Sequence, residues 1–323
     1  MNRTVFIPEP IAEAGMALLR GTCDCIAPWA HDAQASSPRE IDIPENAEAV
    51  IVRLFAVTAQ HFKAASRLRV IAKHGVGVDN IDVPEATRRR IPVVFTPTSN
   101  ANAVAEHAIT LMLALARQLE PAVNAIRAGR FHERTQIAGV ELAGKTLAVL
   151  GLGRIGRRVA EIASRGFAMR VVGYDPFIEK DQLGDSVRLE PSLEAALAAA
   201  DFVTLHLPLT KDTRQLINAD RLLTVKPTCR IVNTSRGEVI DDQALVQALV
   251  RGRIAGAALD VFEQEPLPAD HPFFATPNLL LTPHISSSTR ESLDRMAIDA
   301  AQGVLDVFDG KRPHCVVNPE VFA

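Results

Sequence analysis

A glycine-rich turn near the middle of the chain constrains the fold more than any other feature. Residues 149–156 read V-L-G-L-G-R-I-G. An apolar run over 145–150 leads into this turn, and small and apolar residues recur at helical spacing over 157–164. The turn is therefore predicted to join a buried strand to a helix.

Each glycine of the turn meets a separate steric demand. Gly151 permits the tight turn, Gly153 lets the backbone approach a pyrophosphate, and Gly156 lets the helix pack closely on its strand. The amino-terminus of the helix offers free N–H groups to the phosphates. Asp175 ends the next apolar run, 24 residues after Gly151, where a carboxylate would bind ribose hydroxyls and disfavour a 2′-phosphate. These features predict a dinucleotide site that prefers NAD.

Length and composition argue against several other classes of protein. A chain of 323 residues suits two domains, and a formal net charge of −3 without a long block of one sign argues against a nucleic-acid or membrane partner. The most apolar long stretch, 101–119, contains Glu106, His107 and Arg117, which predicts a buried helix of a soluble protein. The first residues lack the pattern of a secretory signal. We therefore expect a cytoplasmic protein.

The four cysteines do not have the spacing or the partners of a structural zinc site. Free thiols in a reducing compartment are the preferred interpretation. No metal is expected.

Strand and helix signals alternate in two stretches of the chain. In the first, 1–98, neither a glycine fingerprint nor a strand-terminal acid appears, so we expect a separate domain of similar construction. From Lys145 onward the pattern predicts six strands, at 146–150, 170–174, 201–205, 229–233, 256–259 and 278–281. A final helix over 291–309 is predicted to return to the first domain.

Three polar segments follow predicted strands: N-T-S-R-G-E at 233–238, A-L-D-V-F-E-Q-E-P at 258–266 and L-T-P-H-I-S at 281–286. Ligands of open α/β sheets bind at the carboxyl ends of strands, so these segments are expected to face one crevice. An arginine, a carboxylate and a histidine there suit dehydrogenation of a hydroxy acid. They would supply a carboxylate clamp, a base for the hydroxyl proton and a group that tunes this base.

With these motifs the chain resembles the D-isomer-specific 2-hydroxyacid dehydrogenases nearly end to end. The supporting motifs, in order, are G-V-G-V-D-N-I-D at 75–82, N-A-N-A-V-A-E-H at 100–107, G-L-G-R-I-G-R at 151–157, H-L-P-L-T at 206–210, N-T-S-R-G at 233–237, A-L-D-V-F-E-Q-E-P at 258–266 and T-P-H at 282–284. The resemblance implies an α/β fold of two doubly wound parallel-sheet domains. A Rossmann-type NAD domain over 99–287 would be inserted into a flavodoxin-like substrate domain made of 1–98 and 288–323. It also implies a homodimer, with 101–119 and 121–131 as candidate contact regions.

The same resemblance implies roles for three catalytic residues. Arg236 would pair with the substrate carboxylate and help to polarise the keto oxygen, a task that suits its planar fork better than lysine. His284 would be the acid/base and Glu265 its carboxylate partner. Glu263 competes with Glu265, but Glu265 directly precedes Pro266, as in the family motif.

Further residues are implied to contact the cofactor. Asp260 would hydrogen-bond the nicotinamide carboxamide, or alternatively cap its strand. Backbone groups would line the dinucleotide at Arg154, Ile155, Leu207, Thr234 and Ser235.

Candidate substrate contacts lie mostly in the first stretch of the chain. Backbone N–H groups of Val76 and Gly77 would hold the substrate carboxylate, unless this loop is a plain strand-end turn, and Asn100 would reach the same pocket. Arg53, Lys73 and Arg134 resemble phosphate-holding positions of phosphoglycerate dehydrogenases, although each suits a solvated surface charge equally well. Lys73 stands where an arginine is expected.

The implied reaction is hydride transfer between NAD(H) and a small 2-hydroxy or 2-keto acid, with D-3-phosphoglycerate and 3-phosphohydroxypyruvate as the first choice. Hydroxypyruvate or glyoxylate reduction is a close second, because the sequence ends about forty residues after His284, without the regulatory extension common among phosphoglycerate dehydrogenases. A non-catalytic NAD-sensing corepressor is a third interpretation. The intact set of Arg236, Glu265 and His284 argues against it.

Overall fold

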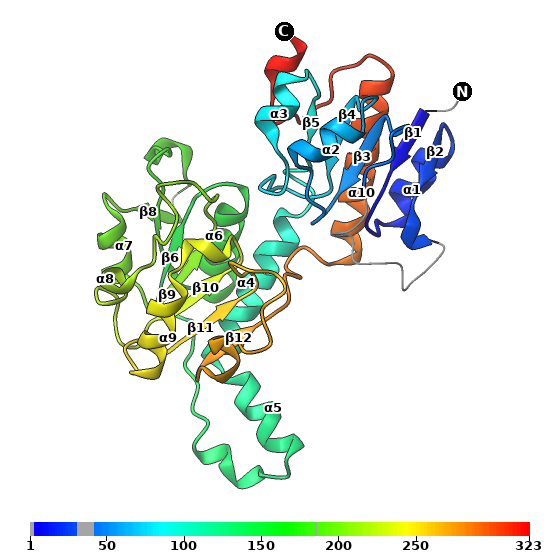
Figure 1. Ribbon diagram of the computed structural model, residues 1–323. Helices are drawn as coiled ribbons and strands as arrows, with labels where there is room; N and C mark the ends of the chain where they lie inside the picture. Colours follow the sequence, from blue (N-terminus) through cyan, green and yellow to red (C-terminus); the bar gives the residue numbers. More distant parts are fainter. Residues whose placement is uncertain (1–2, 31–41, 185) are drawn as a thin grey trace. The chain divides into compact units, whose positions relative to one another are not determined.

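The computed structural model describes residues 3–30, 42–184 and 186–323, and the chain divides into two compact units (Figure 1). The first unit comprises residues 1–100 with 288–323, and the second comprises residues 101–287. Each unit has its own parallel sheet and its own hydrophobic cores.

The first unit is built on five parallel strands in the order β2-β1-β3-β4-β5. The strands are β1 (Arg3–Phe6), β2 (Cys23–Ile26), β3 (Ala49–Val52), β4 (Val70–Lys73) and β5 (Val93–Val94). The central strands β3 and β4 are buried along their whole length, as expected where helices cover both faces of a parallel sheet. One face packs against α1 (Glu13–Arg20) and α10 (Arg290–Phe308), and the other against α2 (Ala59–Ala64) and α3 (Val83–Arg88).

Helix α10 joins the first unit from the far end of the chain. A Cβ atom at Gly15 of α1 would lie only 2.6 Å from the backbone oxygen of Ala297 in α10. The absence of a side chain at this glycine allows the two helices to pack backbone against backbone. The carboxy-terminal helix thus completes the core of the amino-terminal sheet.

The second unit is built on seven parallel strands in the order β12-β11-β10-β9-β6-β7-β8. They are β6 (Thr146–Leu150), β7 (Arg170–Tyr174), β8 (Val187–Leu189), β9 (Phe202–Leu205), β10 (Arg230–Asn233), β11 (Gly256–Leu259) and β12 (Leu279–Leu281). From β6 the sheet grows first through β7 and β8 and then, from β9 onward, in the opposite direction. Ligands of doubly wound sheets bind outside the carboxyl ends of the strands at such a reversal.

Helices cover both faces of this second sheet. One core contains residues of α4 (Ala101–Ala116) and α6 (Arg154–Phe167), and the other contains residues of α7 (Leu193–Ala199), α8 (Ala219–Leu222) and α9 (Asp242–Val250). Helix α5 (Leu119–Arg127) extends away from the sheet (Figure 1). The short 3-10 helices are η1 (Pro28–Ala30), η3 (Phe131–Thr135), η4 (Lys180–Gln182), η5 (Gly237–Val239), η6 (Pro272–Ala275) and η7 (Pro319–Phe322).

The prediction of two parallel-sheet α/β domains is confirmed, with differences in detail. Strands β2 and β8 are not predicted, and the six strands expected after residue 145 are seven. Both are edge strands with an exposed charged residue, Asp24 in β2 and Arg188 in β8, so neither has the continuous apolar run of a buried inner strand. The helix expected over 101–119 is α4, which ends at Ala116, and Gln118 adopts a left-handed φ of +48° before α5 begins at Leu119. Among the described residues, no helix has both the length and the apolar character needed to cross a bilayer.

Candidate active site

The glycine turn lies between β6 and α6, as its sequence predicts, and its geometry explains each glycine. Gly151 has a left-handed φ of +90°, and a Cβ atom there would lie 2.5 Å from the backbone oxygen of His206. A Cβ atom at Gly156 would lie 1.9 Å from the oxygen of Gly151, so α6 packs directly on the turn. At Gly153, the N-cap of α6, a Cβ atom would instead point into open space. The turn therefore offers backbone N–H groups and room for a pyrophosphate.

Asp175 follows β7 and is bonded to this turn. One carboxylate oxygen, Oδ2, accepts a hydrogen bond from the backbone N–H of Leu152 at 2.9 Å. The other, Oδ1, accepts from the backbone N–H of Phe177 at 3.0 Å. Each carboxylate oxygen has more than one acceptor site, so these bonds leave capacity for ribose hydroxyls. The open cradle at Gly153 and this carboxylate together fit an NAD molecule.

The other predicted cofactor contacts lie along the same carboxyl edge of the sheet. Arg154 and Ile155 form the first turn of α6, and Leu207 follows β9. Thr234 and Ser235 follow β10 and are buried, and within the described residues the Thr234 hydroxyl has no hydrogen-bond partner. A buried hydroxyl of this kind is suited to a bound ligand.

The histidine and its carboxylate partner are in direct contact. The Nδ1 atom of His284 lies 2.7 Å from Oε2 of Glu265, and Oε1 of Glu265 accepts a hydrogen bond from the backbone N–H of Phe262 at 3.0 Å. A proton on Nδ1 satisfies this contact with the carboxylate, which leaves Nε2 as the atom for proton exchange. The side chain of the competitor Glu263 is more exposed than that of Glu265, and its Oε1 atom lies 3.6 Å from Nη1 of Arg214 instead.

Asp260 organises the loop that contains His284. It follows β11, is fully buried, and accepts hydrogen bonds from the Thr282 hydroxyl at 2.6 Å and from the backbone N–H groups of Ile285 and Ser286 at 2.9 and 2.8 Å. Burial raises the pKa of Asp260, but hydrogen bonds from His107, from Thr282 and from the two backbone groups outweigh it and hold the pKa below its usual value. The carboxylate therefore stays charged. Its contact with a nicotinamide carboxamide stays a prediction.

Arg236 lies in a loop that Asn233 shapes. The side-chain oxygen of Asn233 accepts hydrogen bonds from the backbone N–H and the hydroxyl of Ser235, and its amide donates to the backbone oxygen of Arg236 at 2.7 Å. The next residue, Gly237, touches the segment that contains Glu265, because a Cβ atom there would lie 2.1 Å from the backbone carbon of Phe262. The sheet edge formed by β10, β11 and β12 therefore gathers Arg236, Glu265 and His284.

Sequence reasoning missed three residues that build this edge: Asn233, His107 and Thr282. His107 and Thr282 lie within motifs of the family resemblance, but no local pattern indicates that they meet Asp260. His107 is 175 residues from Thr282 in sequence, yet its Nε2 atom lies 3.2 Å from the Thr282 hydroxyl.

The predicted substrate contacts of the first unit lie at the carboxyl ends of β3 and β4. Lys73 is buried, and its ammonium donates hydrogen bonds to the Asn80 side chain at 2.6 Å and to the backbone oxygen of Arg53. The guanidinium of Arg53 donates to the backbone oxygen of Pro10 at 3.1 Å. Lys73 thus supports the loop after β3.

That loop is also held by a buried carboxylate. Glu9 accepts hydrogen bonds from the backbone N–H groups of Arg53, Leu54 and Phe55 at 2.6 to 2.9 Å. Three successive N–H groups that converge on one carboxylate form an anion-binding nest. The nest fixes the backbone of Arg53 whatever its side chain binds.

The remaining candidates are partly buried or exposed. Val76 and Gly77 are half-buried after β4, and Asn100 is buried, with a side-chain oxygen that has no hydrogen-bond partner among the described residues. Arg134 belongs to the second unit, where it lies over the ring of Phe131 in η3. The substrate roles of these residues stay predictions.

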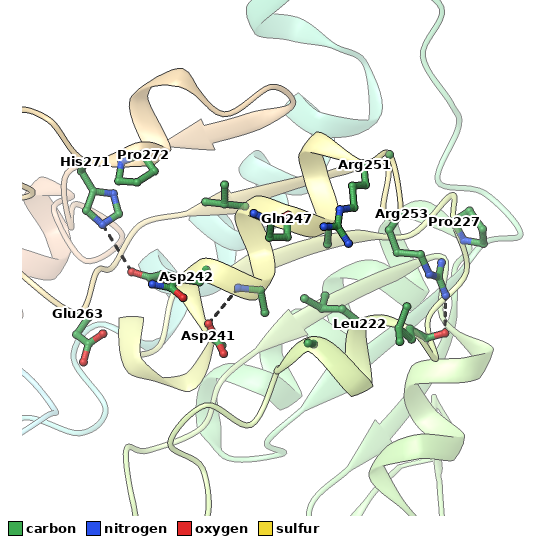
Figure 2. Close-up of a pocket in the computed structure, with 17 residues that line it drawn as sticks. Leu222, Pro227, Asp241, Asp242, Gln247, Arg251, Arg253, Glu263, His271 and Pro272 are labelled. Atoms are coloured by element: carbon green, nitrogen blue, oxygen red, sulfur yellow. Dashed lines mark hydrogen bonds and ion pairs between the residues drawn. The ribbon is translucent and has the colours of Figure 1, made fainter.

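A large cavity of the second unit lies beside α8 and α9. It has a volume of about 1200 Å³, and none of the predicted site residues lines it. Figure 2 shows His271 facing Asp242 there, with their Nε2 and Oδ2 atoms 3.8 Å apart. Burial, followed by the charges of Glu263, Asp241 and Glu238, raises the pKa of Asp242 to about 6.

Comparison with known proteins agrees with this geometry. Residues 109–286 match the family model described as D-isomer specific 2-hydroxyacid dehydrogenase, NAD binding domain. The chain belongs to the D-isomer specific 2-hydroxyacid dehydrogenase family. The predictions of this family, of its Rossmann-type fold, of its NAD cofactor and of an NAD-dependent oxidoreductase are thus confirmed at the level of the family.

Individual relatives differ in the substrate that their names imply. The chain is 41% identical over 318 residues to D-3-phosphoglycerate dehydrogenase of Synechocystis, covering 97% of this chain and 56% of that one. It is 40% identical over 324 residues to glyoxylate reductase of Thermofilum pendens, covering 98% and 95%. D-lactate dehydrogenase of Aquifex aeolicus, solved with NAD and lactic acid, has a TM-score of 0.84 and 28% identity, covering 98% and 99%. The chain therefore spans little more than half of the first relative but nearly all of the second.

Proposed function

We propose that the protein is an NAD-dependent D-2-hydroxyacid dehydrogenase that interconverts a small 2-hydroxy acid and the corresponding 2-keto acid. The observation that carries this proposal is the contact of 2.7 Å between His284 and Glu265, on the same sheet edge as Arg236. A histidine paired with a carboxylate, beside an arginine, suits proton transfer to a keto oxygen.

The second unit would bind NAD and the first would supply substrate contacts. The turn at Gly151–Gly153, the amino-terminus of α6 and Asp175 would hold the adenosine and pyrophosphate. When bound, the nicotinamide of NADH supplies the hydride for keto-acid reduction.

The residues of this chain would then handle the substrate and the proton. His284 would give the proton on Nε2 to the keto oxygen during reduction and take it back during oxidation. Glu265 would keep the imidazole oriented through Nδ1 and stabilise the imidazolium. The planar guanidinium of Arg236 would pair with the substrate carboxylate in two parallel hydrogen bonds.

The substitution His284→Ala tests this proposal. We expect kcat for keto-acid reduction to fall by about 10³-fold, because a general acid contributes about 10²- to 10⁴-fold. The Kd of NADH, measured by fluorescence, should change less than about twofold. His132→Ala, at an exposed histidine of η3, is the matched control and should keep full turnover. A comparable weakening of NADH binding in His284→Ala would instead indicate a structural histidine.

Two substrates are candidates. Arg53 favours 3-phosphohydroxypyruvate. A guanidinium has five N–H donors, and since the contact with Pro10 uses one, the Arg53 side chain can also donate to a substrate phosphate. Lys73 favours hydroxypyruvate or glyoxylate, because its ammonium is already bonded to Asn80 and to the loop after β3.

Steady-state reduction of glyoxylate, hydroxypyruvate and 3-phosphohydroxypyruvate by NADH would choose between them. In Arg53→Ala, whose backbone keeps its bond to Glu9, kcat/KM for the phosphorylated acid should fall at least about tenfold more than for hydroxypyruvate if Arg53 binds a phosphate. Equal losses would favour the unphosphorylated acids. Binding of NADH without reduction of any acid in the panel would favour the corepressor interpretation.

We also propose that the protein acts as a homodimer in the cytoplasm. Large apolar side chains are exposed on and next to α5 and η3, at Leu119, Ile126 and Phe131. Phe274 of η6 is also exposed and lines a pocket with residues of α5. Clustered exposed apolar side chains favour a protein partner, and a second copy of the chain is the simplest one.

A further inference from the structure

We propose that His107 is a positioning residue for His284 and acts through Thr282 and Asp260. His107 itself has no part in the function proposed above. The inference rests on the acid/base role proposed for His284, and it goes beyond that role by naming the residues that set the geometry of the imidazole.

The four residues form a connected path. The Nε2 atom of His107 lies 3.2 Å from the hydroxyl of Thr282 and 3.5 Å from Oδ1 of Asp260. The Thr282 hydroxyl lies 2.6 Å from that same carboxylate oxygen. Asp260 in turn binds the backbone on the other side of His284, at Ile285 and Ser286. Residues on both sides of His284 are thus hydrogen-bonded to the buried carboxylate of Asp260.

The direction of each hydrogen bond follows from the charge of Asp260. A carboxylate accepts only, so the Thr282 hydroxyl donates a hydrogen bond to Asp260. The Thr282 oxygen then accepts a hydrogen bond from the N–H group at Nε2 of His107. Both neighbours of Nε2 are acceptors, which assigns the tautomer of His107 with a proton on Nε2.

The backbone conformation of His284 needs the restraint that these hydrogen bonds provide. His284 has a left-handed φ of +52°, a region that residues with a Cβ atom rarely adopt. Such a conformation persists only where the surrounding structure holds it. The bonds to Thr282, Ile285 and Ser286 supply that restraint, and His107 fixes the position of Thr282 from helix α4.

Four variants test the inference by kcat and KM for the 2-keto acid that the wild type reduces fastest, and by the Kd of NADH. Thr282→Val removes the hydroxyl that donates to Asp260, and His107→Phe removes the N–H group that donates to Thr282. We expect kcat to fall at least about tenfold in each, because small displacements of a catalytic group are costly. The Kd of NADH should change less than about twofold. Thr282→Ser and His107→Gln keep a donor and should recover at least about half of the lost kcat.

A second comparison separates positioning from general stability. In a His284→Ala background, His107→Phe should lower the residual rate less than about twofold, because residues that act as one unit are not additive. Thr110→Val, which removes an exposed hydroxyl from the same helix α4, is the matched control and should keep the wild-type kcat. If His107→Phe does not fold, the two Thr282 variants give the same comparison.

Two results would overturn the inference. One is wild-type kcat in both His107→Phe and Thr282→Val. The other is a loss from the second substitution that is as large in the His284→Ala background as in the wild type. Undiminished turnover in His284→Ala alone would instead refute the proposed role of His284, so the two failures can be told apart.

Discussion

At the scale of single residues, we propose two roles for the carboxylate of Asp175. Its oxygens accept backbone N–H groups from the glycine turn at Leu152 and from the segment after β7 at Phe177. In our proposal the same oxygens also bind the ribose hydroxyls, where a 2′-phosphate would meet their negative charge. Under this proposal, one residue sets both the shape of the glycine turn and the preference between NAD and NADP.

The substitution Asp175→Asn separates the two roles, because it removes the charge but keeps an acceptor oxygen. We expect the preference for NADH over NADPH, measured as the ratio of kcat/KM values, to narrow by about tenfold, a change of about 1.4 kcal/mol. Asp175→Ala should also weaken binding of both cofactors, since both backbone N–H groups lose their acceptor. Glu179→Gln, at an exposed residue nearby, should leave the ratio unchanged. An unaltered ratio in Asp175→Asn would contradict the ribose assignment.

At the scale of the elements, the active site depends on the close approach of two strand-end segments. Gly237 begins η5, and a Cβ atom there would lie 2.1 Å from the backbone carbon of Phe262 and 2.3 Å from the backbone nitrogen of Glu263. Both obstacles are backbone atoms, which cannot rotate away as a flexible side chain does. The segment with Arg236 therefore touches the segment with Glu265 only because residue 237 is a glycine.

For Gly237→Ala we accordingly expect the two segments to separate. The kcat for keto-acid reduction should fall at least about tenfold, because Arg236 and Glu265 no longer lie at their native spacing. Gly166→Ala is the matched control, since Gly166 lies inside α6 and a Cβ atom there meets open space. That control should keep kcat and gain roughly 0.5 to 1 kcal/mol of stability. Native kcat in Gly237→Ala would show that the contact is not needed.

At the amino-terminus of α9, the carboxyl group of Asp242 lies in an unfavourable electrostatic environment. Burial and the negative charges of Glu263, Asp241 and Glu238 raise the pKa of Asp242 from 3.8 to about 6. In the folded state this carboxyl therefore holds a proton to higher pH than in the unfolded state. The folded state loses stability as pH rises from about 4 to about 6, and the loss is complete above that range.

We therefore expect Asp242→Asn to raise the melting temperature by about 2 °C at pH 7.5, because the amide removes the buried charge. The gain should shrink steadily as the pH is lowered toward 4, because the folded wild type then holds the proton and the unfolded state begins to bind it. Thermal melts from pH 4 to pH 8 would measure it, with Asp220→Asn on the exposed side of α8 as the control. A lower melting temperature for Asp242→Asn at pH 7.5 would contradict the sign.

At the scale of the whole molecule, the proposed homodimer explains the exposed apolar surface near α5. Leu119, Ile126 and Phe131 are each more than half exposed. Single exposed apolar residues are common, but several in adjacent elements indicate an interaction surface. Figure 1 shows that α5 extends away from the sheet of its own unit, where it is accessible to a second copy.

Light scattering coupled to size exclusion should give twice the chain mass of 34.9 kDa, about 70 kDa, for the wild type. We expect the double variant with Ile126→Asp and Phe131→Asp to elute near 34.9 kDa, because burying two carboxylates in an apolar interface is costly. Val250→Asp, at an exposed apolar residue at the end of α9, should leave the mass unchanged. A dimeric mass for the double variant would place the interface elsewhere.

The sequence by itself determined those features of the protein that depend on the sterics of a few neighbouring residues and on the order of strands and helices along the chain. The glycine turn, the acid after the next strand and the alternation of strands and helices all follow from demands within a few residues, and they predicted the α/β class correctly. Ordered motifs also brought Arg236, Glu265 and His284 into one hypothesis.

Only the tertiary structure decided how those residues are held. It paired His284 with Glu265, joined His107 to Thr282 across 175 residues of sequence, and directed Lys73 to a neighbouring loop. It also added the edge strands β2 and β8. The physical reason is that such contacts depend on where distant strands end in space, and no periodicity or spacing within a segment reports that position.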